Sequence, residues 1–161
     1  DSDESRGLGD VYKRQTYDAA QDECFFAEKG QGAWMNETRM RVSGRRSMVD
    51  CVFATGLPSA GRSDLPQTLK DLAQILPVTS GVRNFGSPSL DLAYVAAGRF
   101  DGVWERRLKI WDLAAGIVIL KEAGGFIESI YPGGNMLEDG TVIGSNDQIF
   151  AQFSKAIRKS N

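Results

Sequence analysis

Apolar residues in the first part of the chain recur in short runs with the spacing of β-strands. Residues 39–42 alternate charged and apolar side chains, as expected for a strand with one face in water. Residues 49–55 form a more continuous apolar run that ends at Gly56, which predicts a more deeply buried strand. Four strands are predicted here, at residues 23–28, 33–36, 39–43 and 49–55, with a turn at residues 36–37.

In the second part, helical periodicity alternates with strand-like runs. Helices are predicted at residues 65–76, 111–122 and 147–157, with another that opens at Pro88 and stops at Gly98. Strands are predicted at residues 78–85, 100–108, 126–131 and 141–144. The helix over residues 111–122 is apolar nearly all round, so we expect it to lie buried between two layers. Strands that alternate with helices in this way are typical of a layered α/β domain.

The predicted helices carry suitable residues at their starts. Asp64 or Ser63 can cap the first helix, and Ser87 can cap the helix that opens with Pro88 at its first position. Asn146 is the expected cap of the closing helix. Apolar residues at helical spacing define the predicted buried face of the first helix: Leu65, Leu69, Leu72, Ala73 and Leu76.

The first fifteen residues differ in character from the rest. They are polar and lack periodicity, so little fixed structure is expected there. Residues 5–15 resemble translated sequencing-adapter sequence of the kind found at the ends of environmental gene fragments. We therefore interpret residues 1–15 as a non-native tail and residues 16–161 as the rest of a single domain, with a native extension as the alternative.

Composition and charge narrow the classes of function. The 161 residues suit about one domain with a real core, and 42% hydrophobic and 25% charged residues are ordinary for a globular protein. The net charge of −2, with Lys and Arg spread along the chain, argues against a dominant role on nucleic acid or anionic membrane. No apolar run approaches the roughly 18–20 residues of a membrane span, and no signal peptide is recognised.

The chain contains no histidine. This excludes Ser-His-Asp and Cys-His catalysis and imidazole metal ligands among its own residues. Chemistry carried by this chain must therefore rest on carboxylates, which suit hard cations such as Mg²⁺. Cys24 and Cys51 lie far apart without a C-x-x-C pattern, so they are predicted to be free buried thiols in a reducing cytoplasm.

The candidate chemistry is concentrated in residues 104–116, Trp-Glu-Arg-Arg-Leu-Lys-Ile-Trp-Asp-Leu-Ala-Ala-Gly. Asp112 begins an apolar helix, where spacing alone favours a capping role over metal binding. Glu105 lies on the preceding strand, where the residues alone favour a solvated acid among cations. Ala123, Gly124 and Gly125 follow eleven residues after Asp112.

This block resembles the C-terminal motif of the inositol monophosphatase family of magnesium-dependent phosphatases. The resemblance covers residues 16–161 and implies the C-terminal part of a layered α-β-α-β-α fold. It implies Mg²⁺ as cofactor, with Asp112 as a metal ligand beside the substrate and Glu105 as the acceptor of hydrogen bonds from substrate hydroxyls. It also implies that Gly86 and Ser87 present backbone and hydroxyl groups to the substrate, although Pro88 departs from the more frequent Ala of the family.

The run over residues 95–105 points, by resemblance, to inositol monophosphatase proper. The implied activity of the parent protein is hydrolysis of inositol monophosphate by a Mg²⁺-dependent phosphomonoesterase. Family members that act on a nucleotide 3′-phosphate or on fructose bisphosphate are the alternative. The implied substrate is a small phosphorylated polyol, and the implied setting is a cytoplasmic homodimer in the intact protein, with neither nucleic acid nor membrane as partner.

Two upstream motifs of the family do not occur in this chain. These are a Glu-rich segment and Asp-Pro-x-Asp-Gly-Thr, which in the family supply further metal ligands and receive the phosphate. We therefore assign no catalytic residue and expect this chain to be inactive alone. A non-catalytic binding half-protein is a further alternative.

Four further charged residues are candidate components of the site. Arg83 is expected to pair with a nearby acid rather than bind an anion. Arg106, Arg107 and Lys109 form a cationic cluster that is either a solvated face or an attractor of a phosphorylated substrate. The larger aromatic residues are expected in the core or in subunit contacts: Trp34, Phe85 and Trp104.

Overall fold

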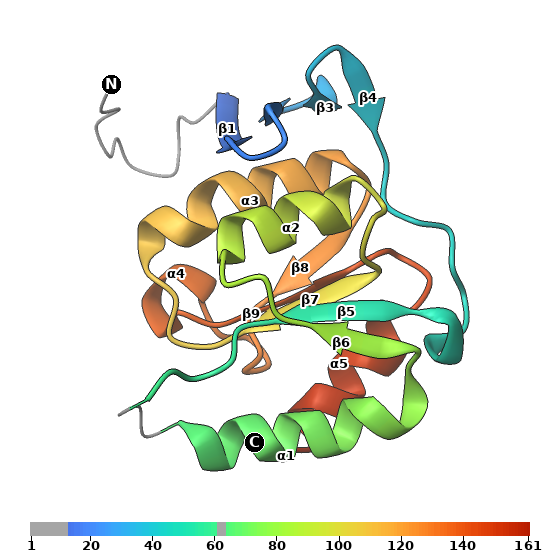
Figure 1. Cartoon of the computed structure of the whole chain (residues 1–161), viewed down its shortest axis with the longest axis vertical. Coiled ribbons are helices and arrows are strands. Elements are labelled where there is room, and N and C mark those ends of the chain that lie inside the picture. Colours follow the sequence, from blue (N-terminus) through green and yellow to red (C-terminus); the bar gives the residue numbers. More distant parts are fainter. Residues whose placement is uncertain (1–12, 61–63) are drawn as a thin grey trace.

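The computed structural model describes residues 13–60 and 64–161. These residues form four layers: an antiparallel sheet, a pair of helices, a mixed sheet and a second pair of helices (Figure 1). The predicted layered α/β fold is therefore confirmed. Within the described part of the chain, every helix is too short or too polar to cross a membrane.

The N-terminal strand begins within the segment that is predicted to be a tail. Strand β1 (Lys13–Asp18) begins three residues before Thr16 and pairs antiparallel with β2 (Glu23–Glu28). The expectation of no fixed structure is therefore wrong for residues 13–15. Strand pairing uses backbone groups alone, so a polar segment without periodicity can still extend an existing strand. The rest of the predicted tail, residues 1–12, lies outside the described residues.

Two further strands, β3 (Gly32–Met35) and β4 (Thr38–Met40), complete an antiparallel sheet in the order β1-β2-β3-β4. The predicted turn at residues 36–37 is confirmed, with Asn36 at a positive φ of 50° and its side chain accepting the N–H of Cys24. One face of this sheet is buried against the helix layer through a short set of apolar side chains: Phe25, Ala27, Ala33 and Met40.

The mixed sheet organises the rest of the chain. Its strands are β5 (Val52–Thr55), β6 (Gly81–Arg83), β7 (Gly102–Glu105), β8 (Phe126–Glu128) and β9 (Val142–Ser145), in the order β6-β5-β7-β9-β8. Strand β5 is parallel to both β6 and β7, whereas β9 is antiparallel to β7 and β8. The helices are α1 (Leu65–Ile75), α2 (Pro88–Ala96), α3 (Ile110–Glu122), the short α4 (Met136–Asp139) and α5 (Phe150–Arg158).

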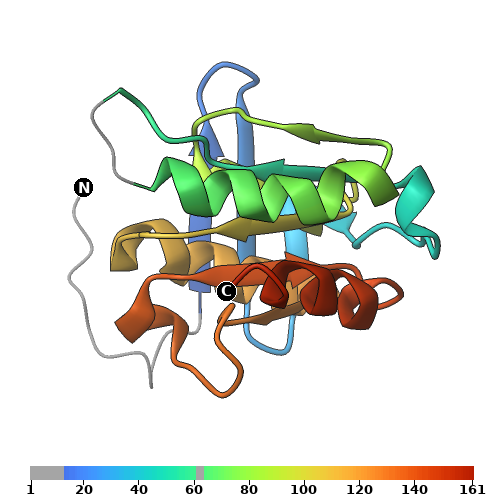
Figure 2. The same cartoon turned by 90° about the horizontal axis from the view of Figure 1, so that it is seen from below.

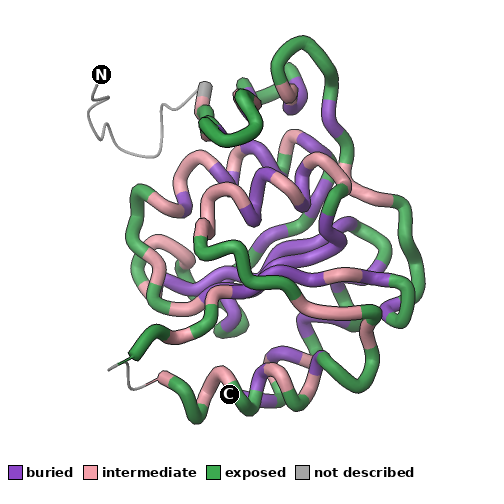
Figure 3. Tube along the Cα trace, viewed as in Figure 1, coloured by how far each residue is buried: buried purple, intermediate pink, exposed green. Residues whose placement is uncertain are grey.

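Helices α2 and α3 lie between the two sheets, and α1 and α5 lie side by side on the other face of the mixed sheet (Figure 2). The alternation of side chains along the central strands explains this arrangement. Ala54 and Val103 face the layer of α2 and α3, whereas Phe53 and Trp104 belong to the core beneath, against α5. The prediction that residues 111–122 form a helix buried between layers is confirmed, and Figure 3 shows the buried central sheet and inner helix faces.

The buried face predicted for α1 is wrong. Leu65, Leu69 and Leu76 are each about half exposed, and the fully buried side chains of the helix are Asp71 and Ile75. The helix itself is confirmed, with Asp64 at its N-cap position and Pro66 in its first turn, although no side chain caps it. The carboxylate of Asp71 is buried because hydrogen bonds from other elements satisfy it, and an apolar pattern carries no information on such bonds.

Other predicted boundaries shift where short 3₁₀ turns replace strand. Residues 48–50 and 76–78 form such turns, so β5 starts at Val52 and β6 is limited to three residues. The closing helix begins at Phe150 rather than residue 147, because Asn146 caps a turn that precedes it. Its side-chain oxygen accepts the N–H groups of Gln148 and Ile149, at 3.0 Å each.

The last residue of α3 ties the helix to the β2–β3 turn. The two carboxylate oxygens of Glu122 accept the N–H groups of Gly30 and Gly32, at 2.9 and 3.0 Å. Both glycines have positive φ angles, of 81° and 85°, so the turn adopts a conformation that other residues rarely reach. A charged group that accepts two backbone N–H groups stabilises such a turn more than a neutral one does.

We predict that Glu122→Ala lowers the free energy of unfolding by about 1.5–3 kcal/mol, because two charge-assisted hydrogen bonds to the turn are lost. Urea unfolding followed by circular dichroism measures the change. Glu37→Gln, at the exposed turn between β3 and β4, is the matched control and should change stability by less than about 0.5 kcal/mol. Equal effects of the two substitutions would show that the Glu122 contact contributes nothing.

Candidate functional site

A cavity of about 370 Å³ opens where the parallel strands of the mixed sheet end. Strands β5, β6 and β7 are parallel, and each is followed by a helix, so three helix N-termini come to the same edge of the sheet. The strand order also reverses at β5, with β6 on one side and β7 on the other. Crevices outside the carboxyl ends of strands at such a reversal are the usual ligand sites of α/β sheets, and helix N-termini favour anions.

The cavity brings together three of the four predicted site residues. Glu105, Gly86 and Asp112 all line it, whereas the half-buried Ser87 does not. The other lining residues come from the ends of β5 and β7, the loop before α2 and the start of α1: Thr55, Gly56, Leu57, Pro58, Asp64, Thr68, Asp71, Asn84, Pro88, Trp104, Arg106, Arg107, Leu108 and Lys109.

The ends of β5 and β7 hold Glu105 in the cavity wall. The buried hydroxyl of Thr55 donates a hydrogen bond to the carbonyl oxygen of Trp104, at 2.7 Å, which joins the two strands where they end. A Cβ atom added to Gly56 would lie 2.7 Å from Oε2 of Glu105. The residue after β5 is therefore required to be glycine for the Glu105 carboxyl group to occupy this position.

Glu105 is buried, not solvated. Only 4% of the residue is exposed, and burial raises the pKa of its carboxyl group, with the neighbouring Asp91 of α2 raising it further. The pKa of Asp91, which is fully buried, is also raised by burial. The interpretation of Glu105 as a solvated acid among cations is therefore wrong, because its side chain points into the domain rather than into water.

The raised pKa values of Asp91 and Glu105 predict that the chain loses stability as pH rises. The folded-state pKa values are raised, to about 6 for Asp91 and about 8 for Glu105, from ordinary values near 4. Their contribution to stability is therefore complete below about pH 4 and is lost as pH rises through about 8. The carboxyl groups whose pKa is lowered, such as Asp18 and Asp139, lose their contribution to stability only when the pH falls below their ordinary pKa, which is below this range.

We expect the melting temperature to fall steadily from pH 5 to pH 8.5, and Glu105→Gln to remove most of that slope. Differential scanning calorimetry in buffers of matched ionic strength measures both. A melting temperature that rises over this range would contradict the prediction.

Asp112 lies in the first turn of α3 and is half-buried. Its Oδ2 accepts the backbone N–H of Lys109 at 3.4 Å, which is a long contact. The capping role considered from spacing is therefore present but weak, and the carboxylate keeps most of its capacity to accept other bonds. A cavity-lining acid with free acceptor sites is chemically suited to a hard cation.

The loop before α2 brings backbone groups to the cavity. Gly86 has a φ of +73°, and its N–H donates to the side chain of Asn84. No atom lies within 4 Å of a Cβ added there, so glycine is needed for this backbone conformation and not for space. Ser87 occupies the N-cap position of α2, and Pro88 follows at the first helical position as predicted, but the hydroxyl of Ser87 makes no capping bond.

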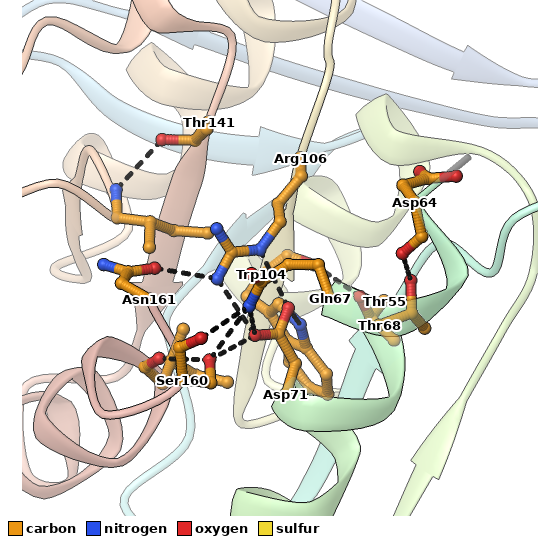
Figure 4. Close-up of polar contacts among 12 residues, drawn as sticks. Thr55, Asp64, Gln67, Thr68, Asp71, Trp104, Arg106, Thr141, Ser160 and Asn161 are labelled. Carbon is orange, nitrogen blue, oxygen red and sulfur yellow. Dashed lines mark hydrogen bonds and ion pairs between the residues drawn. The ribbon is translucent and has the colours of Figure 1, made fainter. Parts of the chain in front are cut away.

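The predicted cationic cluster divides in two. Arg106 is not free: its guanidinium group forms a two-point ion pair with the buried Asp71 of α1, with N–O distances of 2.8 and 2.9 Å. Figure 4 shows this group turned toward Asp71. Arg107 and Lys109 are exposed and line the cavity, and Arg107 has a positive φ of 59°. The attraction of a phosphorylated substrate therefore stays a prediction for these two residues only.

The remaining predictions from the sequence are confirmed only in part. Arg83 donates to the carbonyl oxygen of Val82 and does not line the cavity, so the expected pairing with an acid is not what the structure shows. Trp104 is in the core, as expected. Phe85 is 61% exposed and therefore not in the core, so a subunit contact stays the prediction for it. Both cysteines are free thiols, but only Cys51 is fully buried.

Sequence reasoning missed Asp91 and Asp71. A signal was available for Asp91, which is an acid within an otherwise apolar helix. Asp71 has polar neighbours along its helix, so no comparable signal was available there.

Comparisons with known proteins agree with this geometry. A family model described as the inositol monophosphatase family matches residues 15–161. The chain is 44% identical to an inositol-1-monophosphatase of Mesorhizobium japonicum over 94% of this chain and 57% of that protein. It is 38% identical to a putative Nus factor SuhB of Neisseria meningitidis over 92% of this chain and 57% of that protein.

A solved structure is also similar. The crystal structure of the extragenic suppressor protein suhB from Bartonella henselae matches with a TM-score of 0.88 and 42% identity, over 94% of this chain and 59% of that one. The chain therefore spans a little more than half the length of the relatives it matches.

Proposed function

The chain belongs to the inositol monophosphatase family, and on that premise we propose that it forms the substrate-binding part of a Mg²⁺-dependent phosphomonoesterase that hydrolyses inositol monophosphate. The observation that carries the proposal is the convergence of Glu105, Gly86 and Asp112 on one cavity at the ends of parallel strands. Acids that accept hydroxyl hydrogen bonds and helix N-termini that favour phosphate are both needed for a phosphorylated polyol.

The metal site is incomplete in the described residues. Residues 13–60 and 64–161 contain no group of three or more acids or cysteines placed to hold a metal ion. Asp112 offers one oxygen donor of the kind that Mg²⁺ prefers, but one carboxylate does not make a magnesium site. We propose that the remaining ligands belong to the portion of family members that this chain does not match, where Mg²⁺ would supply Lewis acidity to the phosphate.

The residues of this chain then bind and orient the substrate. Glu105 accepts a hydrogen bond from a ring hydroxyl, and the backbone of Gly86 with the N-terminus of α2 faces the polyol. Arg107 and Lys109 add positive charge at the cavity rim, which raises the local concentration of an anionic substrate. We propose that Ser87 contributes to substrate binding from the N-cap position of α2.

The test joins this chain to the unmatched portion of the Mesorhizobium japonicum relative. We expect the fusion protein to release phosphate from inositol monophosphate only when Mg²⁺ is present, and the chain alone to be inactive. Fructose 1,6-bisphosphate and a nucleotide 3′-phosphate in the same assay distinguish the alternative substrates within the family. A folded fusion without activity on any of the three, or turnover by the pure chain, would contradict the proposal.

A second candidate comes from the relatives named Nus factor SuhB. As the alternative to catalysis, we propose a non-catalytic binding role, like that of a Nus factor. The net charge of −2 and the dispersed Lys and Arg residues favour no nucleic-acid partner, which stays a prediction. Fluorescence anisotropy with single-stranded RNA at low and physiological salt tests it, and salt-sensitive binding would favour the second candidate.

The assembly and location of the intact protein are also proposals. We propose a homodimer in the cytoplasm, in line with the free thiols. Light scattering of the purified fusion protein measures its oligomeric state.

A further inference from the structure

Two buried acids adjoin each other beside the cavity. Asp91 lies in the first turn of α2 and is 0% exposed, and Glu105 ends β7. Among the described residues, three oxygens of this pair accept no hydrogen bond from an N–H or O–H group: both carboxyl oxygens of Asp91 and Oε1 of Glu105. Buried carboxyl oxygens without a donor are rare in folded proteins because they have lost water and gained nothing in its place.

Helix α2, which carries Asp91, packs against β7, which ends at Glu105, and each of the two acids influences the pKa of the other. After burial, the largest influence on each is the other acid: Asp91 raises the pKa of Glu105, whereas a hydrogen bond from Glu105 lowers that of Asp91. Two ionised carboxylates have no proton to donate, so the pair is unsatisfied when both are charged. One shared proton makes one acid a donor to the other, which satisfies both carboxyl groups.

We propose that Asp91 is a positioning residue for Glu105: the two carboxyl groups share one proton, which forms a hydrogen bond between them. This bond fixes the Glu105 side chain in the cavity wall, with its other oxygen left to accept a hydrogen bond from a substrate hydroxyl. The identity of that hydroxyl group as part of a polyol rests on the proposed function. The acid pair itself does not.

The position of Gly56 supports this geometry. Its missing side chain leaves room for Oε2 of Glu105, so the carboxyl group is held between the backbone after β5 and the first turn of α2. The backbone of Gly56 also favours the charged form of Glu105, and burial together with Asp91 outweighs it. Glu105 therefore has one rigid neighbour on each side, as a positioned acceptor requires.

Charged groups face the pair from the elements packed around it. Asp112 of α3 adds negative charge that favours the proton on Glu105, and the charge of Asp71 is balanced by its ion pair with Arg106. The other charged residues that line the cavity are Asp64, Arg107 and Lys109.

The test is a carbon-13 NMR titration of the side-chain carboxyl groups in the whole chain from pH 4 to pH 10. In the unsubstituted protein, Asp91 and Glu105 should titrate in two coupled steps. In Asp91→Asn, Glu105 should titrate in a single step about one pH unit or more lower, because the like charge is gone and the new amide is a donor. Glu37→Gln, an exposed acid far from the cavity, should leave the curve unchanged.

A Glu105 titration that is the same with and without Asp91 would overturn the proposal. If Asp91→Asn does not fold, Glu105→Gln provides the reciprocal measurement. There the midpoint of Asp91 should fall by about one pH unit or more, since the glutamine amide donates permanently. No shift in that variant also overturns the pairing.

Binding of myo-inositol, followed by the Glu105 carboxyl signal, separates positioning from a merely structural role. Asp91→Asn keeps a hydrogen-bonding group and should bind myo-inositol as the parent chain does, whereas Asp91→Leu should bind it at least about fivefold more weakly. Equal affinities in the two variants would overturn the positioning role. If myo-inositol shifts no signal while the coupled titration is present, the proposed polyol function fails and the acid pair stands.

Discussion

Asp71→Ala is expected to lower the free energy of unfolding by about 3–5 kcal/mol. The carboxylate of Asp71 is buried and accepts both guanidinium contacts of Arg106, the indole N–H of Trp104 at 3.2 Å, and bonds from Gln67 and Ser160. Its removal leaves a cation with a side chain only 14% exposed and a buried indole N–H without their acceptor.

This network joins parts of the chain that are far apart in sequence. Asp71 lies on α1, Trp104 and Arg106 lie at the end of β7, and Ser160 lies 89 residues away at the C-terminus (Figure 4). Arg106 also contacts the side chain of Asn161 at 3.0 Å. Since Glu105 lies between Trp104 and Arg106, the same bonds hold the strand end that carries it.

Guanidinium unfolding followed by tryptophan fluorescence measures the loss, because Trp104 is in the network. Glu128→Gln is the matched control: it breaks the ion pair with Arg158 in which the Glu128 side chain is 56% exposed. That pair should contribute less than about 1 kcal/mol. Arg106→Met should cost less than Asp71→Ala, because the other donors to Asp71 remain. A loss below about 1 kcal/mol for Asp71→Ala would show that the network is not stabilising.

Asp112→Asn is expected to lower the Mg²⁺-dependent turnover of the fusion protein by about a thousandfold or more. The neutral amide removes the negative charge that the proposed metal ligand supplies, and metal assistance is worth several kcal/mol, with each 1.4 kcal/mol a factor of ten in rate. A steady-state phosphate-release assay across a range of Mg²⁺ concentrations measures the effect.

The same substitution should leave stability nearly unchanged. Asparagine can still accept the N–H of Lys109, and that contact is long at 3.4 Å. Asp147→Asn, an exposed acid before α5, is the control and should retain full turnover. If Asp112→Asn keeps more than about a tenth of the activity, Asp112 is a capping residue and not a metal ligand. If activity and stability fall together, the role of Asp112 is structural.

Much of the local structure followed from residue chemistry along the chain. Proline at the first turns of α1 and α2, the apolar surface of α3 and the turn at residues 36–37 each depend on neighbours within a few positions. The resemblance of residues 104–116 to a family motif placed Glu105 and Asp112 near each other before any geometry was known. Their roles in binding stay predictions, although the structure brings both to one cavity with Gly86.

What only the tertiary structure decided is the environment of the acids. Whether Glu105 is solvated or buried depends on Asp91 and Gly56, which no periodicity connects to it. Whether Arg106 attracts a substrate or completes an ion pair depends on Asp71 of another helix. The sequence by itself determined most of the helices and strands, but not β1 or the short 3₁₀ turns, because propensity and apolar period act between near neighbours. Hydrogen bonds and charge pairs form between groups that folding brings together. They therefore decided which polar residues remain available to bind a ligand.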